Sequence, residues 1–158
     1  MFKPKGTKSY TPLQIRQKLE KYCAYQERSH LQVFRKCKEY GLSDTDSNEI
    51  LVELIRSNFL NEERFAEAYV RGKFKIMHWG ENKIVQGLKQ AGVSDALITK
   101  SLKQLEFVDQ ETAILKLAQK KWNQLKSGSD FEKKQKVYRY LISKGYSFQQ
   151  VQTVVEQL

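Results

Sequence analysis

Apolar residues recur three and four positions apart along most of the chain, the spacing that places them on one face of an α-helix. Strong helix formers fill many of the polar positions between them. Both prolines, Pro4 and Pro12, lie near the N-terminus, so no proline interrupts the later helical pattern. We therefore predict an all-α protein with almost no strand.

One short pattern occurs three times, around glycines that lie roughly 50 residues apart. Each glycine has an apolar or aromatic residue seven positions before it and an apolar residue four before it. An apolar or aromatic residue and then a serine follow it directly. The three sets are Phe34, Cys37, Gly41, Leu42 and Ser43; Val85, Leu88, Gly92, Val93 and Ser94; and Tyr138, Leu141, Gly145, Tyr146 and Ser147.

A unit of this size cannot bury its apolar face alone and needs its neighbours. The pattern therefore predicts an elongated array of three tandem three-helix repeats. We expect a flexible basic arm over residues 1–10, followed by repeat one (11–59), repeat two (60–108) and repeat three (109–158).

Capping residues predict where the helices begin and end. Thr11, with Pro12 and Gln14 behind it, is expected to open the first helix through a capping box. Asp46 with Glu49 is expected to cap the third helix of repeat one. Further helix starts are predicted at Asn61, Ser94, Asp109, Ser129 with Glu132, and Ser147 with Gln150. Gly41, Gly92 and Gly145 are expected to end the second helix of each repeat in the left-handed conformation.

The apolar stripes of these helices predict the core. The predicted core faces comprise Ile15, Leu19, Tyr22 and Cys23; Ile50, Leu51, Leu54 and Ile55; Phe65, Ala66, Tyr69, Val70 and Phe74; Ile84, Val85 and Leu88; Leu97, Ile98, Leu102 and Leu105; Ile114, Leu117, Ala118 and Trp122; and Val151, Val154, Val155 and Leu158.

The chain carries a net charge of +10 and has an isoelectric point near 9.5, which indicates a polyanion or a partner that carries one. Most basic residues lie in the arm and in the first and second helices of the repeats. We predict that eleven of them contact a filament or phosphates: Arg35, Lys36, Lys38, Arg71, Lys73, Lys75, Lys83, Lys133, Lys134, Lys136 and Arg139. The third helices hold few cations, which disfavours helix-turn-helix reading of duplex DNA.

Other classes of function find little support. Cys23 and Cys37 lie in apolar stripes, with no Cys-x-x-Cys pair and no ligand spacing with His30 or His78, so we expect buried reduced thiols and no metal. No phosphate loop or catalytic motif occurs, and we expect neither an enzyme nor a cofactor. Without a leader or an apolar span, a cytoplasmic protein is expected, and without a heptad seam a monomer.

The segment from Leu60 to Val93 carries a specific combination of motifs. An acidic cap at Asn61, Glu62 and Glu63 precedes Arg64-Phe65-Ala66 and Tyr69-Val70-Arg71. An aromatic turn at Trp79-Gly80 precedes Lys83-Ile84, and Leu88 stands four residues before Gly92-Val93. In these motifs and in the three-triplet layout, the chain resembles the RecX family of recombination regulators. The turn after Trp79 is less basic than is common in that family.

This resemblance implies a non-enzymatic modulator that binds the filament of the RecA recombinase on single-stranded DNA. Such a protein lowers the ATPase, strand-exchange and coprotease activities of the filament, with weak binding to single-stranded DNA alone. An elongated basic solenoid is suited to the groove of such a filament. The sequence leaves open groove binding or end capping, and inhibition or stimulation.

Two alternatives stay open at this stage. One is a nonspecific nucleic-acid-binding helical module with no recombinase partner, and the other a general helical scaffold. A nucleic-acid-binding module could stack bases on its aromatic residues, as single-strand binders do. Phe65, Tyr69, Phe74, Trp122 and Tyr138 fall on predicted core faces, whereas Tyr10, Tyr25 and Trp79 are less committed to the core.

Overall fold

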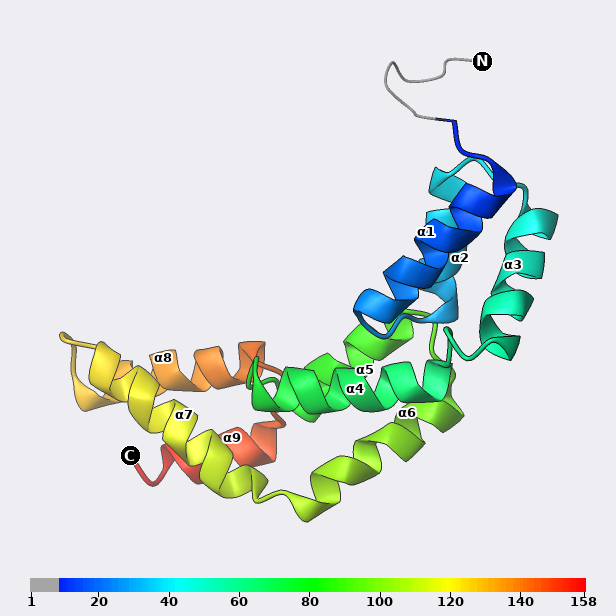
Figure 1. Ribbon diagram of the computed structural model, residues 1–158. Helices are drawn as coiled ribbons and strands as arrows, with labels where there is room; N and C mark the ends of the chain where they lie inside the picture. Colours follow the sequence, from blue (N-terminus) through cyan, green and yellow to red (C-terminus); the bar gives the residue numbers. More distant parts are fainter. Residues whose placement is uncertain (1–8) are drawn as a thin grey trace. The chain divides into compact units, whose positions relative to one another are not determined.

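The computed structural model describes residues 9–158, so Lys3, Lys5 and Lys8 of the predicted arm lie outside the described residues. Within 9–158 the predicted all-α class is confirmed, with nine α-helices, one 3₁₀ helix and no strand (Figure 1). The elements are α1 (Pro12–Tyr25), α2 (His30–Glu39), α3 (Asp44–Arg56), α4 (Glu62–Lys75), α5 (Glu81–Gln90), α6 (Asp95–Leu102), η1 (Lys103–Phe107), α7 (Gln110–Gln124), α8 (Asp130–Ser143) and α9 (Phe148–Val155).

The helices form two compact units whose boundary falls inside α4. Unit 1 ends at Phe65 and contains α1, α2, α3 and the first turn of α4. Unit 2 begins at Ala66 and contains the rest of α4 and all later elements. The second and third helix triplets therefore share one unit.

Side-chain caps fix most helix starts where the sequence predicts them. Thr11 and Gln14 form the predicted capping box of α1, and Ser147 and Gln150 form that of α9. Asn61 Oδ1 accepts from the Arg64 N–H at 2.9 Å, and Asp109 and Ser94 cap α7 and α6. Ser129 caps α8 by accepting from the Glu132 N–H, without the reciprocal bond of a complete box.

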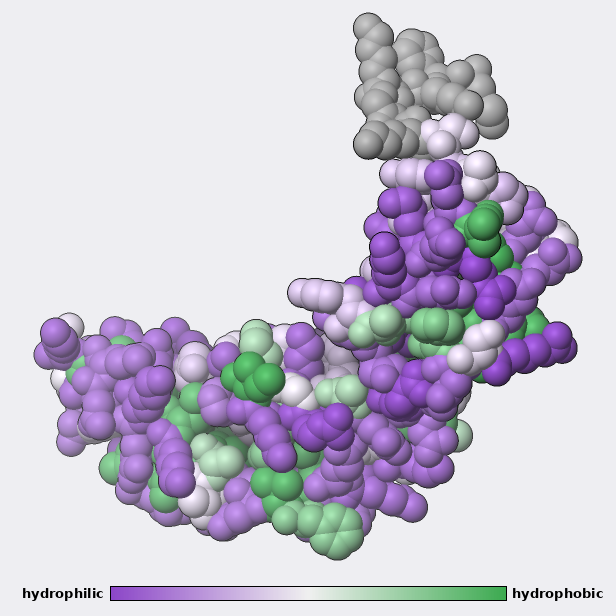
Figure 2. Space-filling view, in the orientation of Figure 1, coloured by the Kyte–Doolittle hydropathy of each residue, from purple (hydrophilic) through white to green (hydrophobic). Residues whose placement is uncertain are grey.

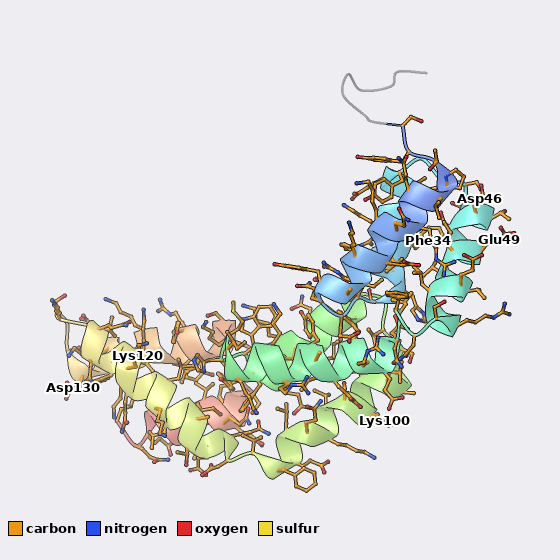
Figure 3. The ribbon with its side chains drawn as sticks, in the orientation of Figure 1. Phe34, Asp46, Glu49, Lys100, Lys120 and Asp130 are labelled. Carbon is orange, nitrogen blue, oxygen red and sulfur yellow. The ribbon has the colours of Figure 1, made fainter. Side chains whose placement is uncertain are left out.

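The predicted cap of the third helix was wrong. Ser43, and not Asp46 with Glu49, caps α3, because its hydroxyl accepts from the Asp46 N–H at 3.1 Å. Asp46 and Glu49 instead lie within α3 (Figure 3). A serine directly before three polar residues that favour caps leaves several possible starts in the sequence.

The second helix of each repeat ends just before a glycine. Gly41, Gly92 and Gly145 have φ values of 83°, 80° and 97°, so the predicted left-handed conformation is confirmed. The third helix of repeat two ends earlier than predicted. Leu105 lies in η1 after α6 has ended at Leu102, and it is still buried.

Each unit has its own apolar core. In unit 1 the core includes Ile15, Leu19, Val33, Leu51 and Leu54, whereas Ile55, which was expected to be buried, is 42% exposed. Cys23 and Cys37 are buried and free, as predicted, and burial raises the pKa of the Cys23 thiol to about 11. In unit 2, α7, α8 and α9 enclose Ile114, Ala118, Val137, Leu141, Tyr146, Val151 and Val154.

A joint between backbone turns connects repeats two and three inside unit 2. The Gly80 N–H donates to the Lys144 carbonyl at 2.7 Å, and the Asn82 N–H donates to the Gly145 carbonyl at 3.1 Å. The Tyr146 hydroxyl donates to the His78 carbonyl at 2.6 Å. The turn before α5 and the turn before α9 are thereby held together, which fixes α5 relative to α8.

The visible face of both units is largely hydrophilic, with apolar residues in small patches (Figure 2). Over residues 9–158 no helix is both long and apolar enough to cross a bilayer. The same residues hold no group of three or more His, Cys, Asp or Glu side chains that could bind a metal ion.

Candidate polyanion-binding site

Two of the three basic candidates on α2 are occupied by neighbouring carboxylates. Lys36 Nζ lies 3.0 Å from Glu39 Oε2, and this hydrogen bond raises the pKa of the lysine. Lys38 Nζ lies 2.8 Å from Asp44 Oδ1. Arg35 is exposed and has no ion pair among the described residues. In repeat one, Arg35 is therefore the candidate best placed to meet an external anion.

Lys73, Lys83 and Tyr69 lie around Trp79, and we call these four residues the Trp79 cluster. Lys73 Nζ lies 4.7 Å and Lys83 Nζ 4.5 Å from the centroid of the indole ring. The Tyr69 ring meets Trp79 edge to face with centroids 6.5 Å apart. Cation–π contacts of this kind contribute about 0.5–1 kcal/mol each at exposed sites. They hold two ammonium groups beside one half-buried ring.

The Trp79 cluster is next to the joint between the repeats. Lys83 Nζ also lies 3.5 Å from the Ser143 carbonyl oxygen, and Lys144 Nζ lies 3.4 Å from that of Met77. Each of these lysines thus reaches from its own repeat to a main-chain oxygen of the other. Carbonyl oxygens carry no net charge, and neither ammonium group is paired with a carboxylate among the described residues.

Arg71 and Lys75 lie one turn apart on α4, and both are exposed. Neither has an ion pair with any residue from 9 to 158. Since nothing described neutralises them, they are available for contact with an external anion.

The structure divides the four basic candidates of α8 between two sides of that helix. Lys133 lies over the Trp122 ring of α7, with Nζ 5.0 Å from the centroid, and Lys136 follows it one turn later. Lys134 and Arg139 instead line a hollow between α8 and α9. The spacing of these four residues follows from the sequence, but what each side of α8 faces depends on the packing of α7 and α9.

Two more lysines belong to the basic surface, although they are absent from the eleven predicted contacts. Lys121 of α7 and Lys144 at the end of α8 lie 5.0 Å and 5.6 Å from the centroid of the Tyr140 ring. The spacing of four between Tyr140 and Lys144 is visible in the sequence, whereas the approach of Lys121 depends on how α7 packs against α8.

The aromatic residues have more varied environments than predicted. Phe65 and Phe74 are buried as expected, but Tyr69, Trp122 and Tyr138 are only partly buried, and burial raises the pKa of Tyr69. The turn at Trp79 packs on repeat three through the bonds of His78 and Gly80. Unit 2 therefore combines unneutralised cations with ring edges, the chemistry that binds phosphates and acidic surfaces.

Two family models match this chain, one from the end of unit 1 into unit 2 and one within unit 2. Residues 61–102 match the family model described as "RecX, second three-helix domain", and residues 109–155 match "RecX, third three-helix domain". Together the two matches cover more than half of the chain.

Curated relatives agree with the family models. The chain is 31% identical over 125 residues to the Regulatory protein RecX of Clostridium perfringens, covering 78% of this chain and 58% of that protein. It is 32% identical over 136 residues to the Regulatory protein RecX of Bacillus licheniformis, covering 86% of this chain and 52% of the relative. The chain thus spans just over half the length of these two relatives.

Solved structures share the fold. A crystal structure of RecX from Lactobacillus salivarius matches with a TM-score of 0.77 and 25% identity, covering 92% of this chain and 95% of that one. A second structure, titled regulatory protein RecX, matches with a TM-score of 0.81 at 24% identity, covering 91% of this chain and 72% of its own, and supports the fold alone.

Proposed function

Because this chain belongs to the RecX family, we propose that it binds the filament formed by the RecA recombinase on single-stranded DNA and lowers its activity. The affected activities are ATP hydrolysis, strand exchange and the coprotease function. Through them the protein would regulate recombinational DNA repair and the SOS response in the cytoplasm. Its relatives carry the name of regulatory proteins and not of enzymes.

The observation that carries this proposal is the set of unneutralised cations in unit 2. Arg71 and Lys75 on α4 and Lys136 on α8 are exposed, and none pairs with a carboxylate within 9–158. A filament on DNA presents phosphates and acidic protein surface together, and an array of fixed cations gains affinity from both. Weak binding to single-stranded DNA alone, by a monomer, is part of the proposal.

A second function is favoured by one specific observation. The Trp79 cluster places lysines beside a ring, a combination that single-strand binders use without any protein partner. On this alternative the chain is a nonspecific nucleic-acid-binding module, and any effect on a recombinase comes from competition for DNA.

One titration separates the two functions. The purified protein is added to the cognate RecA assembled on single-stranded DNA, and ATP hydrolysis is followed at fixed salt. Binding to the naked strand is measured in parallel. We expect hydrolysis to fall at protein concentrations at least tenfold below those that saturate the naked strand. A fall that occurs only on saturation of bare DNA would instead support the nonspecific module.

Charge reversal on α8 tests the contact surface within the same assay. Lys133→Glu with Lys136→Glu reverses the charge of Lys133, which lies over Trp122 of α7, and of the exposed Lys136. We expect weaker binding to the filament and a shallower dependence on salt. The matched control is Lys36→Glu with Lys38→Glu, which changes the net charge by the same amount at two lysines already paired with carboxylates. Unchanged filament affinity in the α8 variant would exclude this side of α8 as a contact.

A further inference from the structure

The face of repeat three between α8 and α9 carries a hollow of about 590 Å³. Its walls include Phe131, Tyr138, Phe148 and Val155, and the rings of Tyr138 and Phe148 meet edge to face with centroids 5.8 Å apart. Phe131 is 71% exposed and Phe148 is 62% exposed. Two large rings that are this exposed beside an apolar hollow mark a surface suited to binding.

The position of Phe148 is occupied by aspartate in the other two repeats. Phe148 is the third residue after Gly145, whereas the third residue after Gly41 is Asp44 and the third after Gly92 is Asp95. Aspartate in the first turn of a helix interacts favourably with the helix dipole, and an exposed phenylalanine does not. The first turns of α3 and α6 are acidic, and that of α9 is not. Stability of α9 therefore does not explain Phe148.

The edge of the hollow is positively charged. Lys134 and Arg139 line it, and none of its described lining residues is acidic. Arg139 Nη2 lies 3.4 Å from Gln135 Oε1, a weak contact that leaves the guanidinium charge unneutralised. Neither cation pairs with a carboxylate in the part of the chain that the structure describes. The first turn of α9 adds the positive end of a helix dipole with no acidic side chain to offset it.

We propose that the α8–α9 hollow binds a short acidic peptide segment of a partner protein. The segment places a large apolar side chain against Phe131 and Phe148, and its carboxylates lie beside Lys134 and Arg139. Apolar burial supplies the affinity, and the two cations select acidic flanking residues. Lys134 and Arg139 are also among the eleven predicted filament or phosphate contacts, but the filament proposal is argued from Arg71, Lys75 and Lys136, so this site does not depend on it.

Two other occupants fit the hollow less well. A second copy of the chain, with its net charge of +10, would be repelled by the basic edge. A nucleobase would stack on the rings, but its hydrogen-bonding edge would face walls made mainly of aromatic and aliphatic carbon. An apolar side chain flanked by carboxylates matches both the walls and the edge.

The probe for the test is a labelled octapeptide in which two leucines and a phenylalanine are flanked by aspartates, and binding is followed by fluorescence anisotropy at low salt. We expect a dissociation constant on the order of 100 µM. Two control peptides, one with lysine for aspartate and one with serine for the apolar residues, should each bind at least tenfold more weakly. Absence of binding by the probe up to about 1 mM would overturn the proposal.

Variants of the protein assign the binding to the hollow. Phe148→Asp installs the residue that repeats one and two have at this position, so folding is expected to persist, and binding of the probe should fall at least tenfold. Arg139→Gln should weaken binding about fivefold. The controls are Phe107→Ala, which removes a ring that is 89% exposed on η1, and Lys120→Gln on α7 (Figure 3). Both controls should bind as the unchanged protein does.

Three results would assign the hollow differently. Equal loss in Phe148→Asp and Phe107→Ala would mean that the peptide adsorbs to any exposed ring. A thymidine oligonucleotide whose binding requires Phe148, while the peptide's does not, would make single-stranded DNA the occupant. Self-association that Phe148→Asp abolishes would make it a second copy of the chain. Because the peptide assay contains no recombinase, failure of the peptide to bind leaves the outcome of the RecA titration open, and only the oligonucleotide result would favour the nonspecific module.

Discussion

A Cβ atom built on Gly80 would lie 2.4 Å from the carbonyl carbon of Gly145, so the two glycines meet backbone to backbone across the joint of repeats two and three. The approach is reciprocal, because a Cβ on Gly145 would lie 2.3 Å from Lys83 Cβ. No other residue type fits either position without moving one of the turns. The hydrogen bonds from Gly80 and Tyr146 depend on this approach.

Gly80→Ala should therefore destabilise unit 2. The added methyl group meets main-chain atoms, which cannot rotate away, so we expect a loss of about 1–3 kcal/mol in the free energy of unfolding. The measurement is urea unfolding followed by circular dichroism. Gly72→Ala is the matched control, because Gly72 lies inside α4 with open space around it, and it should gain about 0.5–1 kcal/mol. Equal effects of the two substitutions would contradict the joint.

Alkaline pH should weaken the same joint through Tyr146. Burial raises the pKa of its hydroxyl to about 12, above the value near 10 of an unfolded tyrosine. Below pH 10 the group is neutral in both states and stability is unaffected. Between pH 10 and 12 the unfolded chain loses this proton first, so stability falls, by about 1 kcal/mol at pH 11.

Tyr146→Phe checks the assignment. It removes the bond to the His78 carbonyl, so it should cost about 0.5–1.5 kcal/mol at pH 8. Between pH 10 and 12 its stability should decline less steeply than that of the unchanged protein, measured by urea unfolding at each pH. Tyr25→Phe, at a position that is 84% exposed, should alter neither the stability at pH 8 nor its decline between pH 10 and 12. An identical alkaline decline in Tyr146→Phe would assign the effect to other groups.

The sequence predicted those parts of the fold that depend on neighbours along the chain. Thr11, Ser147 and Gly145 act on backbone groups within a few residues, so their type and spacing are sufficient to predict a cap or a helix end. Which of Ser43 and Asp46 caps α3 was not predictable in this way. Ser43 and Asp46 are both good capping residues, so residue type alone does not choose between them.

The candidate site was predictable in composition and not in arrangement. Charge alone does not show that Lys38 meets Asp44, or that Lys133 lies over Trp122 while Lys134 lines the hollow. The hollow beside Phe148 also requires α9 to be placed on α8. Its one signal in the sequence is the change from aspartate to phenylalanine at the third position after the repeat glycine.

Unit 1 depends on Arg64 in a way that a stability measurement can test. Arg64 Nε lies 2.6 Å from Glu27 Oε1, and its other nitrogens donate to the side chain and carbonyl of Asn58 at 3.0 Å. The second carboxylate oxygen of Glu27 is buried and has no hydrogen-bond partner among the described residues. Arg64→Met would leave this carboxylate without its cation, so we expect a loss of about 1–3 kcal/mol in urea unfolding.

The control for that loss is Arg35→Met, which removes an exposed arginine and should change stability by less than about 0.5 kcal/mol. Glu27→Gln added to Arg64→Met should restore part of the loss, because a neutral amide is less costly to bury than an unpaired carboxylate. If the double variant is no more stable than Arg64→Met, the arginine contributes through packing and its bonds to Asn58.

Salt dependence distinguishes free from paired cations. Arg71→Gln with Lys75→Gln removes two exposed charges that no described carboxylate neutralises. Lys36→Gln with Lys38→Gln instead removes two charges that are each paired with a carboxylate. Removal of one cation that binds a phosphate should reduce the slope of log K against log salt on single-stranded DNA by about 0.7. We therefore expect a slope shallower by about 1.4 in the α4 variant and nearly unchanged in the α2 variant. Because both variants change the net charge equally, equal slopes would mean that total charge, and not the arrangement of free cations on α4, determines binding.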